Sequence, residues 1–149
     1  MGPLETPTKF RGVAPTFHVA DVLAASAYYR DKLGFAIRPV MIDSAGYWVI
    51  AERDSVEIQL VKSDSPNENR LHGCSILVDS VDQLAAELLA RGANFESGPT
   101  SQEYGNRDFA VTDLDGHYLV FWQPLPPVKF QDHGTNMPML GADDEDQPF

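Results

Sequence analysis

The order of predicted elements in the first half of the chain recurs in the second half. Each half is predicted to fold as a strand, a helix and three further strands, over residues 13–61 and 72–123. Matching positions, such as Val19 and Val78, lie about 60 residues apart. Repeats of this kind indicate units that bury their apolar faces against one another. Since one half alone could hardly bury enough surface to be stable, the two halves are expected to form one domain.

The first half alternates apolar and polar side chains over residues 13–19, which predicts a strand with Val13, Phe17 and Val19 on its apolar face. Asp21 is the predicted N-cap of a helix that ends at Gly34. The apolar positions at helical spacing, and therefore the predicted buried face, are Leu23, Ala24, Ala27, Tyr28 and Leu33. The three following strands are predicted over residues 35–40, 47–52 and 56–61.

The second half repeats this pattern. A strand over residues 74–78 leads to a capping box, Ser80 to Gln83, and to a helix that ends at Gly92. The apolar positions of this helix are Val81, Leu84, Ala85, Leu88 and Leu89. Three strands are predicted to follow, near residues 94–96, 107–112 and 117–122, and the turn at 113–116 joins the last two as a hairpin.

These elements predict an α+β domain in which two βαβββ modules form a curved, open, mixed sheet with the helices outside. The apolar strand faces then lie under the helices, and the opposite faces line a groove. Residues 1–12 are expected to be a leader without regular structure. Residues 125–149 are predicted to form an acidic C-terminal extension, since they contain Lys129 and five acidic side chains.

The charge of the chain limits its partners. The net charge is −11 and the isoelectric point is near 4.5, which argues against binding nucleic acid or an anionic membrane surface and permits a cationic ligand. No stretch approaches the roughly 18 apolar residues of a membrane-spanning helix. The single cysteine, Cys74, excludes an internal disulfide and fits a reducing compartment, so a cytoplasmic location is predicted.

Three stretches carry a resemblance to a known family: Val19–Val22, Tyr28–Phe35 and Arg107–Gly116. In their order and spacing they resemble the glyoxalase/bleomycin resistance protein/dioxygenase superfamily, also called vicinal oxygen chelate proteins, and are closest to its bleomycin-resistance-like branch. The resemblance covers about residues 13–124 and implies paired βαβββ modules, an eight-stranded open sheet and a homodimer. Family functions range from metal-dependent lyases, isomerases, epimerases and dioxygenases to metal-free drug binding, so the fold alone does not name the activity.

The resemblance also implies where a metal would bind. The four groove-facing positions that hold ligands in metal-dependent members correspond here to Ala14, Gln59, Gly73 and Val120. Divalent first-row metals need three or four His, Cys or carboxylate ligands, and only Gln59 could coordinate, so neither a metal nor a cofactor is predicted. A displaced pair, His18 and Glu57, is kept as an alternative, whereas His72 and His117 are expected to point away from the groove.

No catalytic residue is predicted, because Cys74 lies on the core-facing side of its strand and Ser75 has no recognisable base. The predicted ligand-binding residues are His18, Trp48, Glu57, Gln59, Ser75, Glu103, Tyr104, Arg107, Tyr118 and Trp122. Aromatic and acidic side chains together suit a planar or cationic ligand. Ordinary sheet packing for the aromatic residues, a solvated Glu57, and pairing of Arg107 with Asp108 or Glu103 are the structural alternatives.

Three functions follow. The first is a metal-free small-molecule binding protein that sequesters a bulky aromatic or cationic compound in a groove at the dimer interface, with a role in antibiotic resistance. The alternative is a superfamily enzyme, a lyase, isomerase or dioxygenase-like protein, with a displaced metal site. The third is a regulatory or partner-binding module that uses the C-terminal extension.

Overall fold

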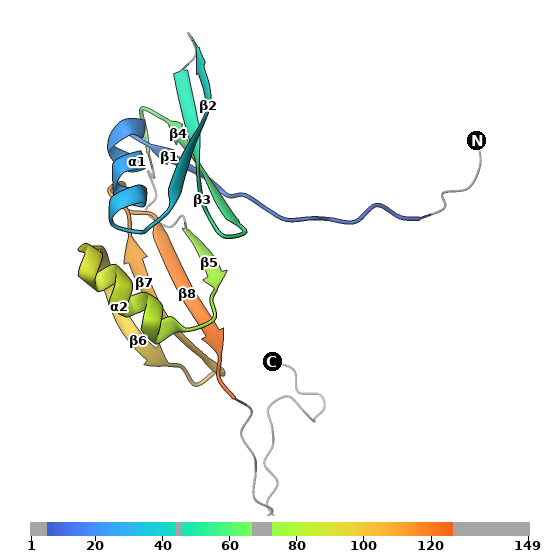
Figure 1. The fold of residues 1–149 in the computed structure, drawn as a ribbon, viewed down its shortest axis with the longest axis vertical. Helices are drawn as coiled ribbons and strands as arrows, with labels where there is room; N and C mark the ends of the chain where they lie inside the picture. Colours follow the sequence, from blue (N-terminus) through green and yellow to red (C-terminus); the bar gives the residue numbers. More distant parts are fainter. Residues whose placement is uncertain (1–5, 44–45, 67–72, 127–149) are drawn as a thin grey trace, which may run out of the picture.

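The computed structural model describes residues 6–43, 46–66 and 73–126. Within these ranges, the side chains of residues 41–43, 46 and 47 are not described. Two βαβββ modules follow one another along the chain (Figure 1). The first contains β1 (Thr16–Val19), α1 (Val22–Asp31), β2 (Ala36–Asp43), β3 (Gly46–Arg53) and β4 (Val56–Lys62). The second contains β5 (Gly73–Leu77), α2 (Val81–Arg91), β6 (Asn94–Ser101), β7 (Asn106–Thr112) and β8 (Tyr118–Pro124). The predicted α+β fold with a repeated module is confirmed.

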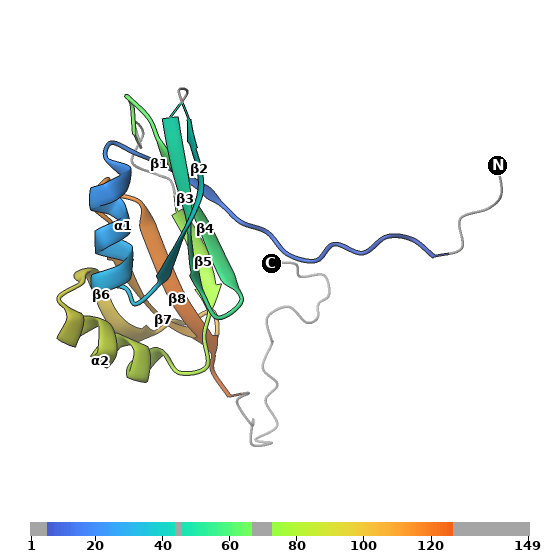
Figure 2. The same ribbon diagram turned by 45° about the horizontal axis from the view of Figure 1, so that its top comes forward.

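Each module forms its own open mixed sheet. The strand orders are β1-β4-β3-β2 and β5-β8-β7-β6, with the first and last strand of each module parallel and the other pairs antiparallel. Hydrogen bonding within the described residues therefore gives two four-stranded sheets and not one sheet of eight strands. Both helices cover the same side of the strands, and residues 6–15 leave the body on the other side (Figure 2).

The strand faces follow the predicted alternation. Ile58 and Leu60 are buried in β4, and Phe109 and Val111 are buried in β7, all on the side that the helices cover. These residues belong to one apolar cluster that contains side chains of both modules. The two sheets therefore share one hydrophobic core.

Of the predicted buried face of the first helix, Leu33 is confirmed as buried, whereas the stripe predicted within α1 itself is wrong. Its buried residues are Val22, Ala25, Ser26 and Tyr29, whereas Leu23 is 68% exposed. The observed buried stripe of α1 is rotated about the helix axis by about one residue, or roughly 100°, from the predicted stripe. Almost every residue from Val22 to Tyr29 is apolar or small, so the hydrophobic pattern alone does not define a unique face. The Tyr29 side chain lies fully buried in this stripe, and its hydroxyl donates a hydrogen bond to the buried Asp113 carboxylate of the other module.

Several element ends also differ from the prediction. The first strand begins at Thr16, and Val13 lies before it with 89% of its surface exposed. α1 ends at Asp31, before Gly34, and Leu89 projects from α2 into solvent. β2 and β6 extend beyond their predicted ends to residues 43 and 101. The predicted N-caps Asp21 and Ser80 are confirmed, since their side chains accept hydrogen bonds from the amides of Ala24 and Gln83.

The modules meet at two junctions, and equivalent elements of the repeat form each of them. At the first junction, the β7–β8 turn of the second module packs on α1 and β1. At the second junction, the β3–β4 turn of the first module packs near α2 and β5. Tyr29 hydrogen bonds Asp113 at 2.8 Å across the first, and Arg53 pairs with Glu87 at 2.7 Å across the second.

Candidate functional site

The sheet face away from the helices, here called the distal face, gathers polar and aromatic side chains in the first module. In the strand register His18 lies beside Val61, and Val61 lies beside Trp48. Gln59 is the next residue of β4 with the same orientation, so His18, Trp48 and Gln59 share one part of this face. Trp48 is half-buried although no helix covers this side.

Glu57 lies further along the same face and in a different environment. It is the cross-strand neighbour of Glu52, and the Arg38 guanidinium lies 3.3 Å from Glu52 and 3.5 Å from Glu57. Glu57 and Val61, the neighbour of His18, lie four positions apart in β4, which is about 13 Å along a strand. Metal-to-ligand distances are near 2 Å, so this register does not fit the displaced pair of His18 and Glu57.

The distal face of the second module carries Ser75, Tyr118 and Trp122. Ser75 lies beside Val120, and Trp122 lies between Leu77 and Asp108. One Asp108 oxygen accepts a hydrogen bond from the Tyr104 hydroxyl and the other from the Gln102 amide, both at 3.0 Å. Tyr104 is therefore held beside Trp122. The sequence prediction missed Asp108, although its alternation with the core residue Phe109 marks it as distal.

Two predicted ligand-binding residues lie elsewhere. Arg107 has the orientation of Phe109, toward the helices, and its guanidinium forms a two-point ion pair with Asp82 of α2 at 2.9 and 3.1 Å. This pairing differs from both partners that the sequence suggested, because α2 lies far from Arg107 in the chain and close to it in space. Glu103 is exposed in the β6–β7 turn, and no hydrogen bond or ion pair within the described residues involves it.

The positions that hold metal ligands in the resembling family do not offer a ligand set here. Gly73 leaves no room for a side chain, since a Cβ atom on it would lie 2.4 Å from the Tyr118 carbonyl oxygen. Across the described residues, His, Cys, Asp and Glu side chains nowhere gather in threes in a geometry that could hold an ion. Gln59 and Val120 offer a single amide between them. The donors of the distal face therefore do not fit a first-row metal.

Cys74 and His117 both lie on the helix side, as predicted. Burial raises the pKa of the Cys74 thiol from 9.0 to about 11, so the reactive thiolate is scarce at neutral pH. The His117 ring is fully buried, stacks on Phe17 at 4.4 Å between ring centres and contacts Asp113 through Nδ1 at 2.9 Å. His117 is thus part of the first junction. His72 lies outside the described residues.

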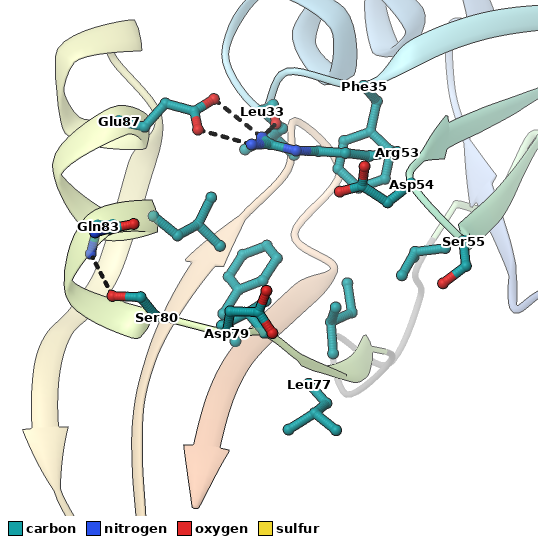
Figure 3. A pocket seen from close by; sticks show the side chains of 15 residues that line it. Leu33, Phe35, Arg53, Asp54, Ser55, Leu77, Asp79, Ser80, Gln83 and Glu87 are labelled. Carbon is teal, nitrogen blue, oxygen red and sulfur yellow. Dashed lines mark hydrogen bonds and ion pairs between the residues drawn. The ribbon is translucent and has the colours of Figure 1, made fainter.

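A separate cavity lies at the second junction. Its volume is about 450 Å³, and residues of α2, the β3–β4 turn and the end of β5 line it (Figure 3). None of the ten predicted ligand-binding residues lines this cavity. The distal face and the second junction are therefore two different candidate sites.

Comparison with known families agrees with the paired modules. The family profile described as "Glyoxalase/Bleomycin resistance protein/Dioxygenase superfamily" matches residues 14–121 of the chain. The chain belongs to this superfamily. The match spans both βαβββ modules, so the predicted family is confirmed. A comparison with curated proteins gave no match.

Solved structures of superfamily type share the fold. TnmS3, an antibiotic binding protein from Streptomyces sp. CB03234, is 25% identical over 79% of this chain and 99% of its own, with a TM-score of 0.63. A bleomycin-binding protein complexed with bleomycin is 23% identical over 76% of this chain and 98% of its own, with a TM-score of 0.63. A glyoxalase-related enzyme from Clostridium phytofermentans is 19% identical over 81% of this chain and 100% of its own, with a TM-score of 0.65.

These neighbours include both a binding protein and an enzyme, so the superfamily fold leaves the activity open. Within the described part of the chain, no helix has the length and apolar character needed to cross a membrane.

Proposed function

We propose that the protein binds a planar or cationic small molecule on its distal face, without a metal ion and without chemical conversion. The observation that carries the proposal is the placement of Trp48, Tyr118 and Trp122, which are half-buried on the sheet side that no helix covers. Aromatic faces stack on planar groups and attract cations. Neighbouring His18, Gln59, Ser75 and the Tyr104–Asp108 pair supply directional polar contacts.

Charge supports a cationic ligand. The net charge of −11 attracts cations over a distance, and the distal face carries Glu52, Glu57 and Asp108. Arg38 offsets part of this charge in the first module. The antibiotic-binding function of TnmS3 and the bleomycin complex of another superfamily member make cationic glycopeptide antibiotics the first ligands to test.

Isothermal titration calorimetry with bleomycin and related cationic glycopeptides tests the proposal. We expect saturable heat with at least one of them and at least a tenfold weaker affinity in the Trp122→Ala variant. The matched control is Leu23→Ala, which removes an exposed apolar side chain on the helix side and should leave the affinity unchanged. Absence of heat with every compound of the panel would contradict the drug-binding function.

We further propose that a second copy of the chain completes the site as a homodimer. Residues 6–15 leave the body on the distal side (Figure 2), and Phe10 is 98% exposed there. Val13 of the same segment is also exposed, so the segment offers more than a single apolar side chain for contact with a second copy. Light scattering coupled to size exclusion should give twice the 16.5 kDa mass of one chain, and a monomer at micromolar concentration would contradict this.

The enzyme alternative depends on a metal and is tested by metal analysis of protein purified without chelator. We expect no stoichiometric divalent ion, because the distal face offers no set of ligands in register. An ion bound at one per chain, and lost in the His18→Ala variant, would favour the enzyme.

The proposed location is the cytoplasm, for which the single cysteine is the support. Residues 127–149 of the predicted C-terminal extension lie outside the described residues, so its partner-binding role stays a prediction.

A further inference from the structure

The two module junctions are equivalent in the repeat but are filled differently. At the first junction, Phe17 stacks on His117, and His117 and Tyr29 both contact the Asp113 carboxylate. The Asp115 side chain of the same turn accepts a hydrogen bond from the Ala20 amide at 3.1 Å. Ring atoms and a hydrogen-bonded turn therefore fill the first junction.

Smaller side chains occupy the matching positions of the second junction. In the strand registers and the helix alignment, Ile76 takes the place of Phe17, and Val56 takes the place of His117. Leu88 likewise takes the place of Tyr29. Three aliphatic side chains of the second junction thus replace three rings of the first. The cavity of about 450 Å³ lies in the second junction, at the position that corresponds to the packed rings of the first. This volume is within the range of small-molecule sites.

The cavity has an apolar floor and an acidic rim. The apolar side chains that line it include Leu33, Phe35, Val56, Ile76, Leu84 and Phe121. On the rim, Arg53 is already occupied, because its guanidinium bonds both Glu87 oxygens at 2.7 and 3.0 Å and the Leu33 carbonyl at 2.9 Å. Asp54 and Asp79 also line the cavity, and no hydrogen bond or ion pair with another described residue engages their carboxylates.

Figure 3 shows that these two carboxylates come from different walls, Asp54 from the β3–β4 turn and Asp79 from the segment before α2. The nearby helix N-terminus does not offer an anion site. The Val81 amide donates to the Gln123 side chain, and the Gln83 and Leu84 amides donate to Ser80. With these donors used and two carboxylates available, the charge of the rim selects a cation.

We propose that the cavity at the second junction is a second ligand site, which takes a small amphiphilic ammonium compound. The apolar part of the ligand lies against Ile76, Leu84 and Phe121, and Asp54 and Asp79 hold its ammonium group. None of the predicted ligand-binding residues of the distal face lines this site, although Leu77, the cross-strand neighbour of Trp122, does. The proposal therefore does not rest on the proposed function.

Nuclear magnetic resonance titration of the full chain with 2-phenylethylammonium and 1-adamantylammonium tests this site. We expect saturable shifts of the amides of residues 53–56 and 76–84. Asp79→Asn should weaken binding at least fivefold, as should Asp54→Asn, which keeps a residue that tolerates the φ of +53° at this position. Asp64→Asn is the matched control, because it removes one exposed carboxylate outside the cavity and should leave the affinity unchanged.

Neutral 2-phenylethanol should bind at least fivefold more weakly than 2-phenylethylammonium. Trp122→Ala should leave the binding of both ammonium probes unchanged, which separates this site from the distal face. Three results would overturn the proposal: no saturable shift with either probe, equal affinity in the wild type and in both Asp→Asn variants, or loss of probe binding in Trp122→Ala. An unfolded variant is recognised by its collapsed amide spectrum. In that case the comparison of 2-phenylethanol with 2-phenylethylammonium in the wild type tests the proposal, and equal affinities of the two compounds would overturn it.

Discussion

Cys74 and Ser75 are neighbours in β5 whose side chains lie in opposite environments. Strand alternation puts Cys74 against the helix-covered core and Ser75 on the distal face. Their neighbour Gly73 has room for no side chain, because β8 passes close to it at Tyr118. Within three residues, one strand therefore packs a partly buried thiol against the core, exposes a hydroxyl and permits a close backbone approach.

The buried thiol should react slowly. A pKa of about 11 in place of 9.0 lowers the thiolate fraction about 100-fold at pH 7.5, and the greater nucleophilicity of a more basic thiolate restores about tenfold. We expect iodoacetamide to alkylate Cys74 about ten times more slowly in the native protein than in urea. The chain has one cysteine, so mass spectrometry reports this site alone. Equal rates in the two states would contradict the burial.

Gly73 should not tolerate a methyl group. In Gly73→Ala the new Cβ would lie 2.4 Å from the Tyr118 oxygen and 2.9 Å from the Tyr118 Cβ, so β5 and β8 must separate. We expect the free energy of unfolding in urea to fall by about 2 kcal/mol. Gly98→Ala is the control, since nothing lies within 4 Å of its Cβ position, and it should change stability by less than about 0.5 kcal/mol. A similar loss in both variants would mean that the contact is not the cause.

At the scale of elements, the strands were easier to predict than the helices. The alternation of Glu57, Gln59 and Val61 with Ile58 and Leu60 gave the correct faces of β4, because only one face of this sheet is covered. In α1 the pattern was ambiguous, and the buried stripe depends on how the helix packs on the sheets. The partner of Arg107 likewise depends on where α2 lies, which no local pattern contains.

The N-cap of α1 offers a direct test of local sequence signals. The Asp21 carboxylate accepts a hydrogen bond from the Ala24 amide at 3.0 Å, so Asp21→Ala should lower the free energy of unfolding by about 1 kcal/mol. Asp64→Ala removes an exposed carboxylate that pairs with Lys62, and should cost less than about 0.5 kcal/mol. Urea unfolding of both variants makes the comparison. Equal losses would show that removal of charge, and not of the cap, is responsible.

On the scale of the whole molecule, the first junction ties the modules together through buried polar groups. Tyr28 donates to the Thr112 carbonyl at 2.9 Å and Tyr29 to Asp113 at 2.8 Å. Burial and the nearby Asp113 charge raise the pKa of Tyr29 well above 10. The repeat itself was visible in the sequence, whereas these contacts between its halves were not, because they join residues more than 80 positions apart.

This junction should make the protein sensitive to alkali. Above pH 10 the unfolded chain loses the Tyr29 proton while the folded protein keeps it, so the free energy of unfolding should fall as pH rises. Tyr29→Phe should lower stability at pH 7 by about 1–3 kcal/mol, because Asp113 loses a buried donor. Its further loss between pH 9.5 and 11 should be smaller than that of the wild type.

Tyr104→Phe is the control for this prediction. Its hydroxyl also bonds a carboxylate, Asp108, but from an exposed turn, so we expect no measurable loss of stability at pH 7. Urea unfolding at a series of pH values measures all three proteins. An alkaline loss of equal size in wild type and Tyr29→Phe would assign the pH dependence to other groups.

The contact between Gly73 and Tyr118 also limits which functions of the superfamily this chain can acquire by substitution. A histidine at Gly73, a position that the family resemblance connects with metal binding, cannot be introduced by one substitution while β8 keeps its path. The backbone of β8 must first move, and that change brings no benefit before the ligands are present. Evolution or design of a metal enzyme from this protein therefore has to pass through a destabilised intermediate, or has to build its ligand set at other positions.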